Sequence, residues 1–159
     1  MNIISSNFQI KNSSFEDNCS DAIDIDFGKL KFENINCENI FNDCLDASGA
    51  QVNGSFLTGN NINDKGLSFG ENSNGEIINI NFQNSRLGVA VKDGSKLKLS
   101  KYKLLNNDYD IAVFNKKNEY DSSSLSITHS LFDNDLKYLI GFNNNITKDN
   151  IILDDKIDN

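Results

Sequence analysis

The sequence predicts an all-β, right-handed parallel β-helix (solenoid) of about six 22-residue coils, and three observations support this fold. The first is a 22-residue repeat that spaces equivalent apolar residues evenly along the chain. The second is the alternation of apolar and polar residues within each repeat, the pattern of a strand with one buried face. The third is the Gly, Asn, Asp and Ser between these short runs, which mark turns and do not fit helices.

The repeat is clearest in one strand of each coil. Its apolar anchors step by 22 residues each time and are Ile23, Leu45, Leu67, Val89 and Ile111, with Leu139 following after 28. A second strand shows the same steps, with 22 residues from Phe8 to Leu30 and 28 from Leu97 to Leu125. Both long steps carry six extra residues, which predicts one insertion around residues 115–120.

The length of the repeat narrows the type of solenoid. Coils of 22 residues with two or three short strands are too long for a left-handed hexapeptide helix and have the size of a right-handed pectate-lyase-like coil. A leucine-rich repeat has a similar length, but its Leu-x-x-Leu-x-Leu signature is absent. We expect the β-helix to cover residues 1–142 and residues 143–159 to form an acidic C-terminal tail or cap. Because open β-edges need protection and no capping helix is visible, we also expect further coils of a longer protein or a capping partner.

Composition and charge exclude several classes of function. The chain has 159 residues and a net charge of −8, which argues against nucleic-acid binding, because that requires a basic face. No apolar run has membrane-spanning length and the N-terminus has no signal-peptide core. Cys19, Cys37 and Cys44 fit no CxxC zinc pattern and are interpreted as small fillers of core or turns. The abundant Asn residues are predicted to stack at turns, each amide bonding to the next coil.

Carboxylates gather on the outward face of the anchor strand. If Ile23 points inward, Asp24 and Asp26 point outward, and Asp46 takes the place of Asp24 one coil later. Parallel strands lie about 4.8 Å apart, so these like charges repel unless a cation, a proton or a lysine intervenes. Asp24, Asp26 and Asp46 are therefore candidate ligands of Ca²⁺, which takes several oxygens.

Lysines on the same face indicate a second chemistry. Lys65 and Lys92 lie among carboxylates, where they would bind an acidic sugar or act as catalytic bases in β-elimination. The candidate substrate-binding residues lie just before this strand, on it, in its following turn or in the inserted loop, and are Asp43, Ser68, Glu71, Asp93, Lys116, Lys117 and Tyr120. The last three belong to the inserted loop, which would line the side of a saccharide groove. The alternative is that Asp and Ser cap strand ends and pair with Lys across coils, without any site; His129 is expected to be a surface residue.

Several of these motifs resemble a bacterial family of right-handed β-helix repeats. Residues 21–27, 42–49 and 64–73 resemble the opening of its repeat, residues 88–95 continue the resemblance and residues 116–120 end it. The match covers about residues 8–142. The chain departs from the family at Cys44, where glycine is usual, and at Asn115 and Asp121, where tyrosine and glycine are expected.

The resemblance carries expectations about location and function. The family is pectate-lyase-like and is found attached to spore-coat-like kinase or lamin-tail-like domains of bacterial surface proteins. The resemblance thus implies an extracellular or cell-surface module that interacts with acidic or neutral polysaccharide, with polysaccharide lyase activity left open. The alternative is a non-enzymatic structural or adhesion module.

Overall fold

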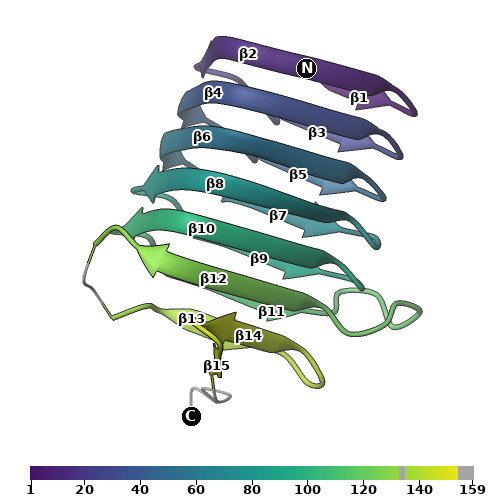
Figure 1. Ribbon diagram of the computed structural model, residues 1–159. Helices are drawn as coiled ribbons and strands as arrows, with labels where there is room; N and C mark the ends of the chain where they lie inside the picture. Colours follow the sequence, from purple (N-terminus) through teal and green to yellow (C-terminus); the bar gives the residue numbers. More distant parts are fainter. Residues whose placement is uncertain (133–134, 154–159) are drawn as a thin grey trace.

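The chain is a right-handed parallel β-helix of about seven turns (Figure 1). The computed structural model describes residues 1–132 and 135–153. Strands alternate between a seven-stranded sheet, ordered β1-β3-β5-β7-β9-β11-β13, and an eight-stranded sheet, ordered β15-β14-β12-β10-β8-β6-β4-β2. The described residues contain no helix long and apolar enough to cross a membrane.

The short strands form one sheet and most of the long strands the other. The seven-stranded sheet contains β1 (Asn2–Ile4), β3 (Ile23–Asp26), β5 (Leu45–Ser48), β7 (Lys65–Gly70), β9 (Leu87–Lys92), β11 (Tyr109–Phe114) and β13 (Tyr138–Ile140). The eight-stranded sheet contains β2 (Asn7–Glu16), β4 (Lys29–Ile40), β6 (Gln51–Ile62), β8 (Asn74–Gln83), β10 (Lys96–Leu105), β12 (Ser124–Ser130), β14 (Asn145–Lys148) and β15 (Ile151–Ile152).

The predicted core column is confirmed in the first five anchors. Each is paired in register with the next and is fully buried, and they are Ile23, Leu45, Leu67, Val89 and Ile111. The expectation for Leu139 is wrong by one residue, because Ile111 is in register with Tyr138 and Ala112 with Leu139. A one-residue change of register moves a side chain to the opposite face of a sheet. Leu139 therefore lies on the outward face, and Tyr138 packs against the core.

The insertion is located where the repeat predicts it. Leu97 is in register with Leu125, so the extra residues form the loop between β11 and β12. Parallel stacking continues beyond residue 142, because β14 pairs with β12. β15 then folds back antiparallel on β14, and Leu153 packs partly buried against the core. The remainder of the predicted acidic tail, residues 154–159, lies outside the described residues.

Asparagine ladders at the bends confirm the predicted role of this residue. The long strands bend at residues with positive φ, a conformation that Asn tolerates well. At one bend the Asn34 amide donates to Asn12 Oδ1 at 2.9 Å. At the next, Asn61 donates to Asn39 at 2.8 Å and Asn39 donates to Asp17 at 3.0 Å. Each ladder joins successive coils.

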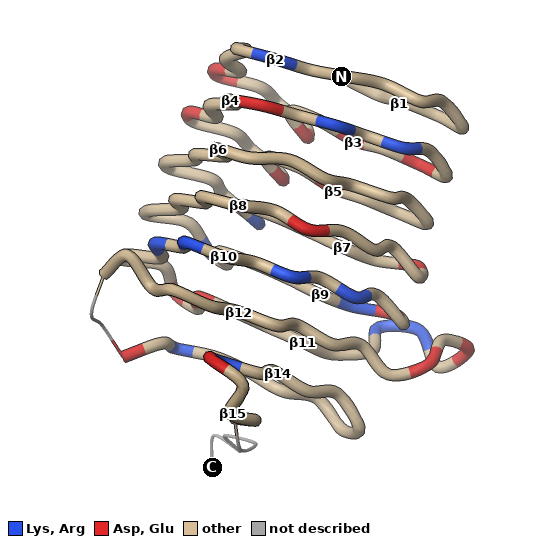
Figure 2. The backbone as a smooth tube through the Cα atoms, in the orientation of Figure 1, with Lys and Arg blue, Asp and Glu red and all other residues tan. Residues whose placement is uncertain are grey.

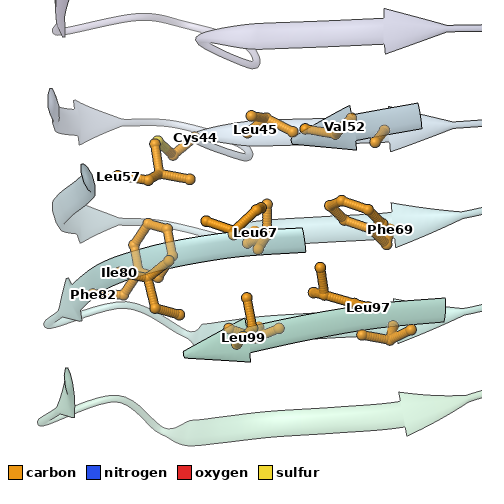
Figure 3. Packing of buried hydrophobic residues seen from close by; sticks show 14 of the residues in the cluster. Cys44, Leu45, Val52, Leu57, Leu67, Phe69, Ile80, Phe82, Leu97 and Leu99 are labelled. Carbon is orange, nitrogen blue, oxygen red and sulfur yellow. The ribbon is translucent and has the colours of Figure 1, made fainter. Parts of the chain in front are cut away.

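The cysteines differ from the prediction, because two of them form a disulfide. Cys37 and Cys44 are bonded to each other and fully buried, whereas Cys19 is free and exposed. Figure 3 shows Cys44 at the same end of the core as Phe82. Twenty-two residues later both positions are glycine, Gly59 and Gly66, and the ring of Phe82 fills the space. A Cβ atom on Gly66 would lie 2.4 Å from that ring. The disulfide and the aromatic ring thus fill the same end of the core in different coils.

Candidate functional site

The predicted site residues lie on or beside the outward face of the seven-stranded sheet. At its centre, Lys92 on β9 extends back over the preceding coil, where its Nζ donates to Ser68 Oγ at 2.8 Å. A Cβ atom on Gly70 would come within 2.9 Å of Lys92 Cε, so the glycine leaves room for this side chain. Ser68 is consequently fully buried although it points outward.

The first coils of this face form an acidic half, which consists of Asp24 and Asp26 on β3 and Asp46 on β5. Asp24 and Asp46 are register neighbours. Burial raises the pKa of Asp24, and the charges of Asp26 and Asp46 raise it further. The cation nearest to Asp46 among the described ion pairs is Lys92, with 3.9 Å between Oδ1 and Nζ. The acidic half is therefore short of positive charge.

The expectation that this half binds Ca²⁺ stays a prediction. In the described part of the chain, no group of three or more His, Cys, Asp or Glu side chains is arranged to hold a metal ion. Asp24 and Asp46 are register neighbours, and Asp26 lies on the same strand as Asp24.

A triad of charges lies at the start of the next strand. Lys65 Nζ is 3.2 Å from Asp43 Oδ1 and also contacts Asp64 Oδ2. The backbone N–H of Lys65 donates to Asp43 Oδ1 at 3.0 Å, just as the N–H of Asp43 donates to Asp21 one coil earlier. Asp43 therefore joins two coils as well as pairing with Lys65.

The environment of this triad sets its protonation. Burial raises the pKa of Asp43 to about 7, against the attraction of Lys65. Burial alone would lower the pKa of Lys65, but Asp43 and Asp64 together outweigh it and raise that pKa. Lys65 is thus a cation at neutral pH, which suits anion binding better than the general-base role predicted for it.

Beside these residues the face is hollowed over β7, β9, β11 and β13. This groove has a volume of about 730 Å³ and is lined by Asp64, Lys65, Arg86, Leu87, Lys92, Tyr109, Ala112, Phe114, Lys116, Leu139, Ile140 and Gly141. Its lining contains four cationic side chains and one carboxylate. Arg86 is mostly exposed, with NH1 3.6 Å from Asp64 Oδ1. The groove is therefore locally basic in a protein of net charge −8.

The inserted loop is held beside the groove by side chains predicted to bind substrate. Asp93 is buried, and its Oδ1 accepts the backbone N–H groups of Lys116 at 2.7 Å and Lys117 at 2.8 Å. The Lys117 ammonium pairs with Glu71 and lies 5.9 Å from the centroid of the Tyr120 ring. Figure 2 shows the lysines of this loop close to the end of β11.

These contacts divide the predicted residues by role. Asp43, Asp93 and Glu71 position the backbone or a lysine, whereas Lys65, Lys92 and Lys116 line the groove. Tyr120 lines a neighbouring hollow of about 650 Å³, which shares Phe114 and Gly141 with the groove.

Two groove residues that sequence reasoning did not select as site residues have signals in the repeat. Tyr109 follows Lys65 by two repeats, and Arg86 follows Asp64 by one. Both residues therefore continue repeat positions that carry a charged residue in an earlier coil.

A further hollow of about 420 Å³ lies on the eight-stranded sheet. Its charged lining residues are Glu76, Lys96 and Lys98, and its described lining contains no aromatic side chain. It therefore lacks the stacking surface that the groove possesses.

No protein-family model, curated protein or solved structure matches the chain.

Proposed function

We propose that the chain is a carbohydrate-interacting β-helix module that binds an acidic saccharide in the groove of the seven-stranded sheet. The observation that carries the proposal is the concentration of Lys65, Arg86, Lys92 and Lys116 beside Tyr109 and Phe114 in an otherwise acidic protein. Lys and Arg donate charge-assisted hydrogen bonds to carboxylates, and aromatic side chains offer flat apolar surface to a sugar ring.

The geometry favours binding over elimination. A general base must be deprotonated at working pH, and Lys65 is held protonated by Asp43 and Asp64. Lys92 donates to Ser68 and neighbours Asp46, so it also acts as a hydrogen-bond donor. We therefore assign both lysines to recognition of the acidic groups.

The proposal includes a location in a bacterial surface or secreted protein. It rests on the motif resemblance and is supported by the buried Cys37–Cys44 disulfide. Disulfides persist mainly in oxidising compartments.

Calorimetry with oligogalacturonates and with neutral gluco-oligosaccharides of equal length tests the proposal. We expect binding of the acidic series alone, weakened by salt because exposed charges are screened. The Lys92→Gln variant should lose roughly tenfold in affinity, the value of one charge-assisted hydrogen bond. Lys31→Gln on the outward side of β4 removes the same charge elsewhere and should leave affinity unchanged. Tighter binding of the neutral series, or equal losses in both variants, would contradict the proposal.

A second candidate, a non-enzymatic structural or adhesion module, has its own supporting observation. The Asp43 and Asp93 carboxylates are occupied by backbone N–H groups of later residues, as in a scaffold. This candidate predicts no binding of either saccharide series to the parent protein.

A further inference from the structure

The lining of the groove is divided between the two ends of β9 and β11. Tyr109 begins β11 and lies in register with Leu87, which is in register with Lys65. Arg86 immediately precedes Leu87. The start of the strands thus brings one aromatic side chain together with two cations.

The other end of the strands repeats this combination. Phe114 ends β11 in register with Lys92, which ends β9. Lys116 follows Phe114 by two residues and lines the same hollow. Both ends therefore combine an aromatic ring with two cationic groups.

Between the two ends the groove is apolar and uncharged. Ala112 and Leu139 are register neighbours on the outward face, and both line the hollow. β11 has six residues. At about 3.3 Å per residue its ends lie roughly 17 Å apart, on the order of four sugar rings.

The acidic half restricts the direction that an anionic ligand can take. A polyanion that ran along the helix axis towards the N-terminus would leave the groove over Asp46 and Asp24, which carry like charge. A polyanion that follows the strands remains over the basic groove. At the Phe114 end it passes into the neighbouring hollow beside Tyr120 and Phe142.

We infer that the ligand is a linear anionic oligosaccharide that lies along β9 and β11, across the helix axis, with an acidic sugar held at each end of the groove. This inference rests on the proposed function. It adds the length and the orientation of the ligand. It also assigns one acidic sugar to Arg86 and the other to Lys116, the more exposed cation at each end of the groove.

A series of oligosaccharides of increasing length tests whether the ligand spans both ends of the groove. Affinity for galacturonic acid oligomers of one, two, four, six and eight units is measured by calorimetry on the parent protein. We expect weak binding of the monomer and dimer, a steep gain of affinity at about four units and a smaller gain beyond, because only a ligand that spans roughly 17 Å reaches both ends.

Variants at the two ends sharpen the test. Arg86→Gln and Lys116→Gln should each weaken binding of the six-unit oligomer roughly tenfold and reduce the advantage of long over short ligands. The matched control is Lys31→Gln, for which no change is expected. Thermal melts of all variants confirm that they fold.

The orientation is tested with the double variant Asp24→Asn, Asp46→Asn. A ligand across the axis predicts the same small gain of affinity for short and long oligomers, because it never reaches the acidic half. A ligand along the axis predicts a gain that grows with length, and this result would overturn the inference. Binding that is independent of length would also overturn it while leaving the proposed function intact. Absence of binding at every length would remove both.

Discussion

The two halves of the outward face use one backbone frame for opposite electrostatic arrangements. In the acidic half, Asp24 and Asp46 occupy the same repeat position in adjacent coils. Two coils after Asp46 that position is Ala90, which is fully buried, and in the next coil it is Ala112, which lines the groove. Charge is thus removed from the centre of the strand in the later coils, and lysines replace it at the edges.

The difference between the halves concerns counterions as well as charge. Lys65 is partnered by Asp43 from the coil before it and by its neighbour Asp64. Asp24 has no described lysine partner; burial and the Asp26 and Asp46 carboxylates raise its pKa, and the N-terminal ammonium offsets part of this effect. In a solenoid, a carboxylate of one coil can pair with a lysine of the next coil. The face of the sheet can therefore hold several lysines without net repulsion between them.

The largest effect should come from removing the core that both halves share. Leu67 is fully buried beneath the boundary between them, and its only stacking neighbours in the column are Leu45 and Val89. Leu67→Ala should lower the free energy of unfolding by about 2–5 kcal/mol, as buried leucine truncations do. Chemical denaturation measures this loss, and Leu131→Ala, at an exposed leucine, is the control. Equal stability of the two variants would mean that the column is not the core.

The triad at the boundary should make stability depend on pH. The pKa of Asp43 is raised from 3.8 to about 7 by burial, so the folded state binds this proton more tightly than the unfolded state does. The contribution of protonated Asp43 to the free energy of unfolding is complete below pH 4. It is lost as pH rises towards 7, with a slope of at most about 1.4 kcal/mol per pH unit. Denaturation of the parent and of Asp43→Asn across this range should give a difference that follows the slope. A pH-independent difference would show that Asp43 does not titrate there.

Removal of Lys65 should leave the buried Asp43 carboxylate without its cation and lower the free energy of unfolding. The side chain of Asp43 is only 3% exposed, and Lys65 is its described cationic partner. Lys65→Met should destabilise the protein by about 1–3 kcal/mol at pH 8 and by less at pH 5, where Asp43 is protonated. Melts at both pH values provide the measurement, with Lys31→Met as the control. A loss of the same size at both would attribute the effect to packing rather than to charge.

Much of the fold could be predicted because the β-helix repeats its constraints. Each coil requires an apolar residue at the same position of the core. The column from Ile23 to Ile111 is therefore visible in the sequence as a 22-residue step. The repeat no longer predicts the register where it is interrupted. Between Ile111 and Tyr138 the spacing is neither 22 nor 28, and the alternation alone cannot fix which of two neighbouring residues faces inward.

The site was less predictable, because the groups that contact one another in it lie in different coils. The sequence places Lys65 and Asp43 in one column, but it does not show that Asp93 is occupied by the backbone of Lys116 and Lys117. The disulfide was missed for a related reason. Cys37 lies in β4 and Cys44 just before β5, which belongs to the other sheet, and an odd number of cysteines argues for no particular pairing.

The smallest effect concerns the acidic half itself. Neither Asp24 nor Asp46 has a described side-chain hydrogen bond to another coil. The Asp24→Asn, Asp46→Asn double variant therefore loses only the long Asp46–Lys92 ion pair of 3.9 Å and removes the repulsion between the two carboxylates. We expect it to be more stable than the parent by up to about 1 kcal/mol, as for like charges on paired strands. Because the pKa of Asp24 is raised, the gain should be larger at pH 7 than at pH 3, where the parent is also neutral at this position. Thermal melts at both pH values, with and without added calcium, complete the comparison. Calcium that stabilises only the parent would establish the predicted Ca²⁺ site, whereas a variant that melts earlier than the parent without calcium would show that these carboxylates hold the coils together.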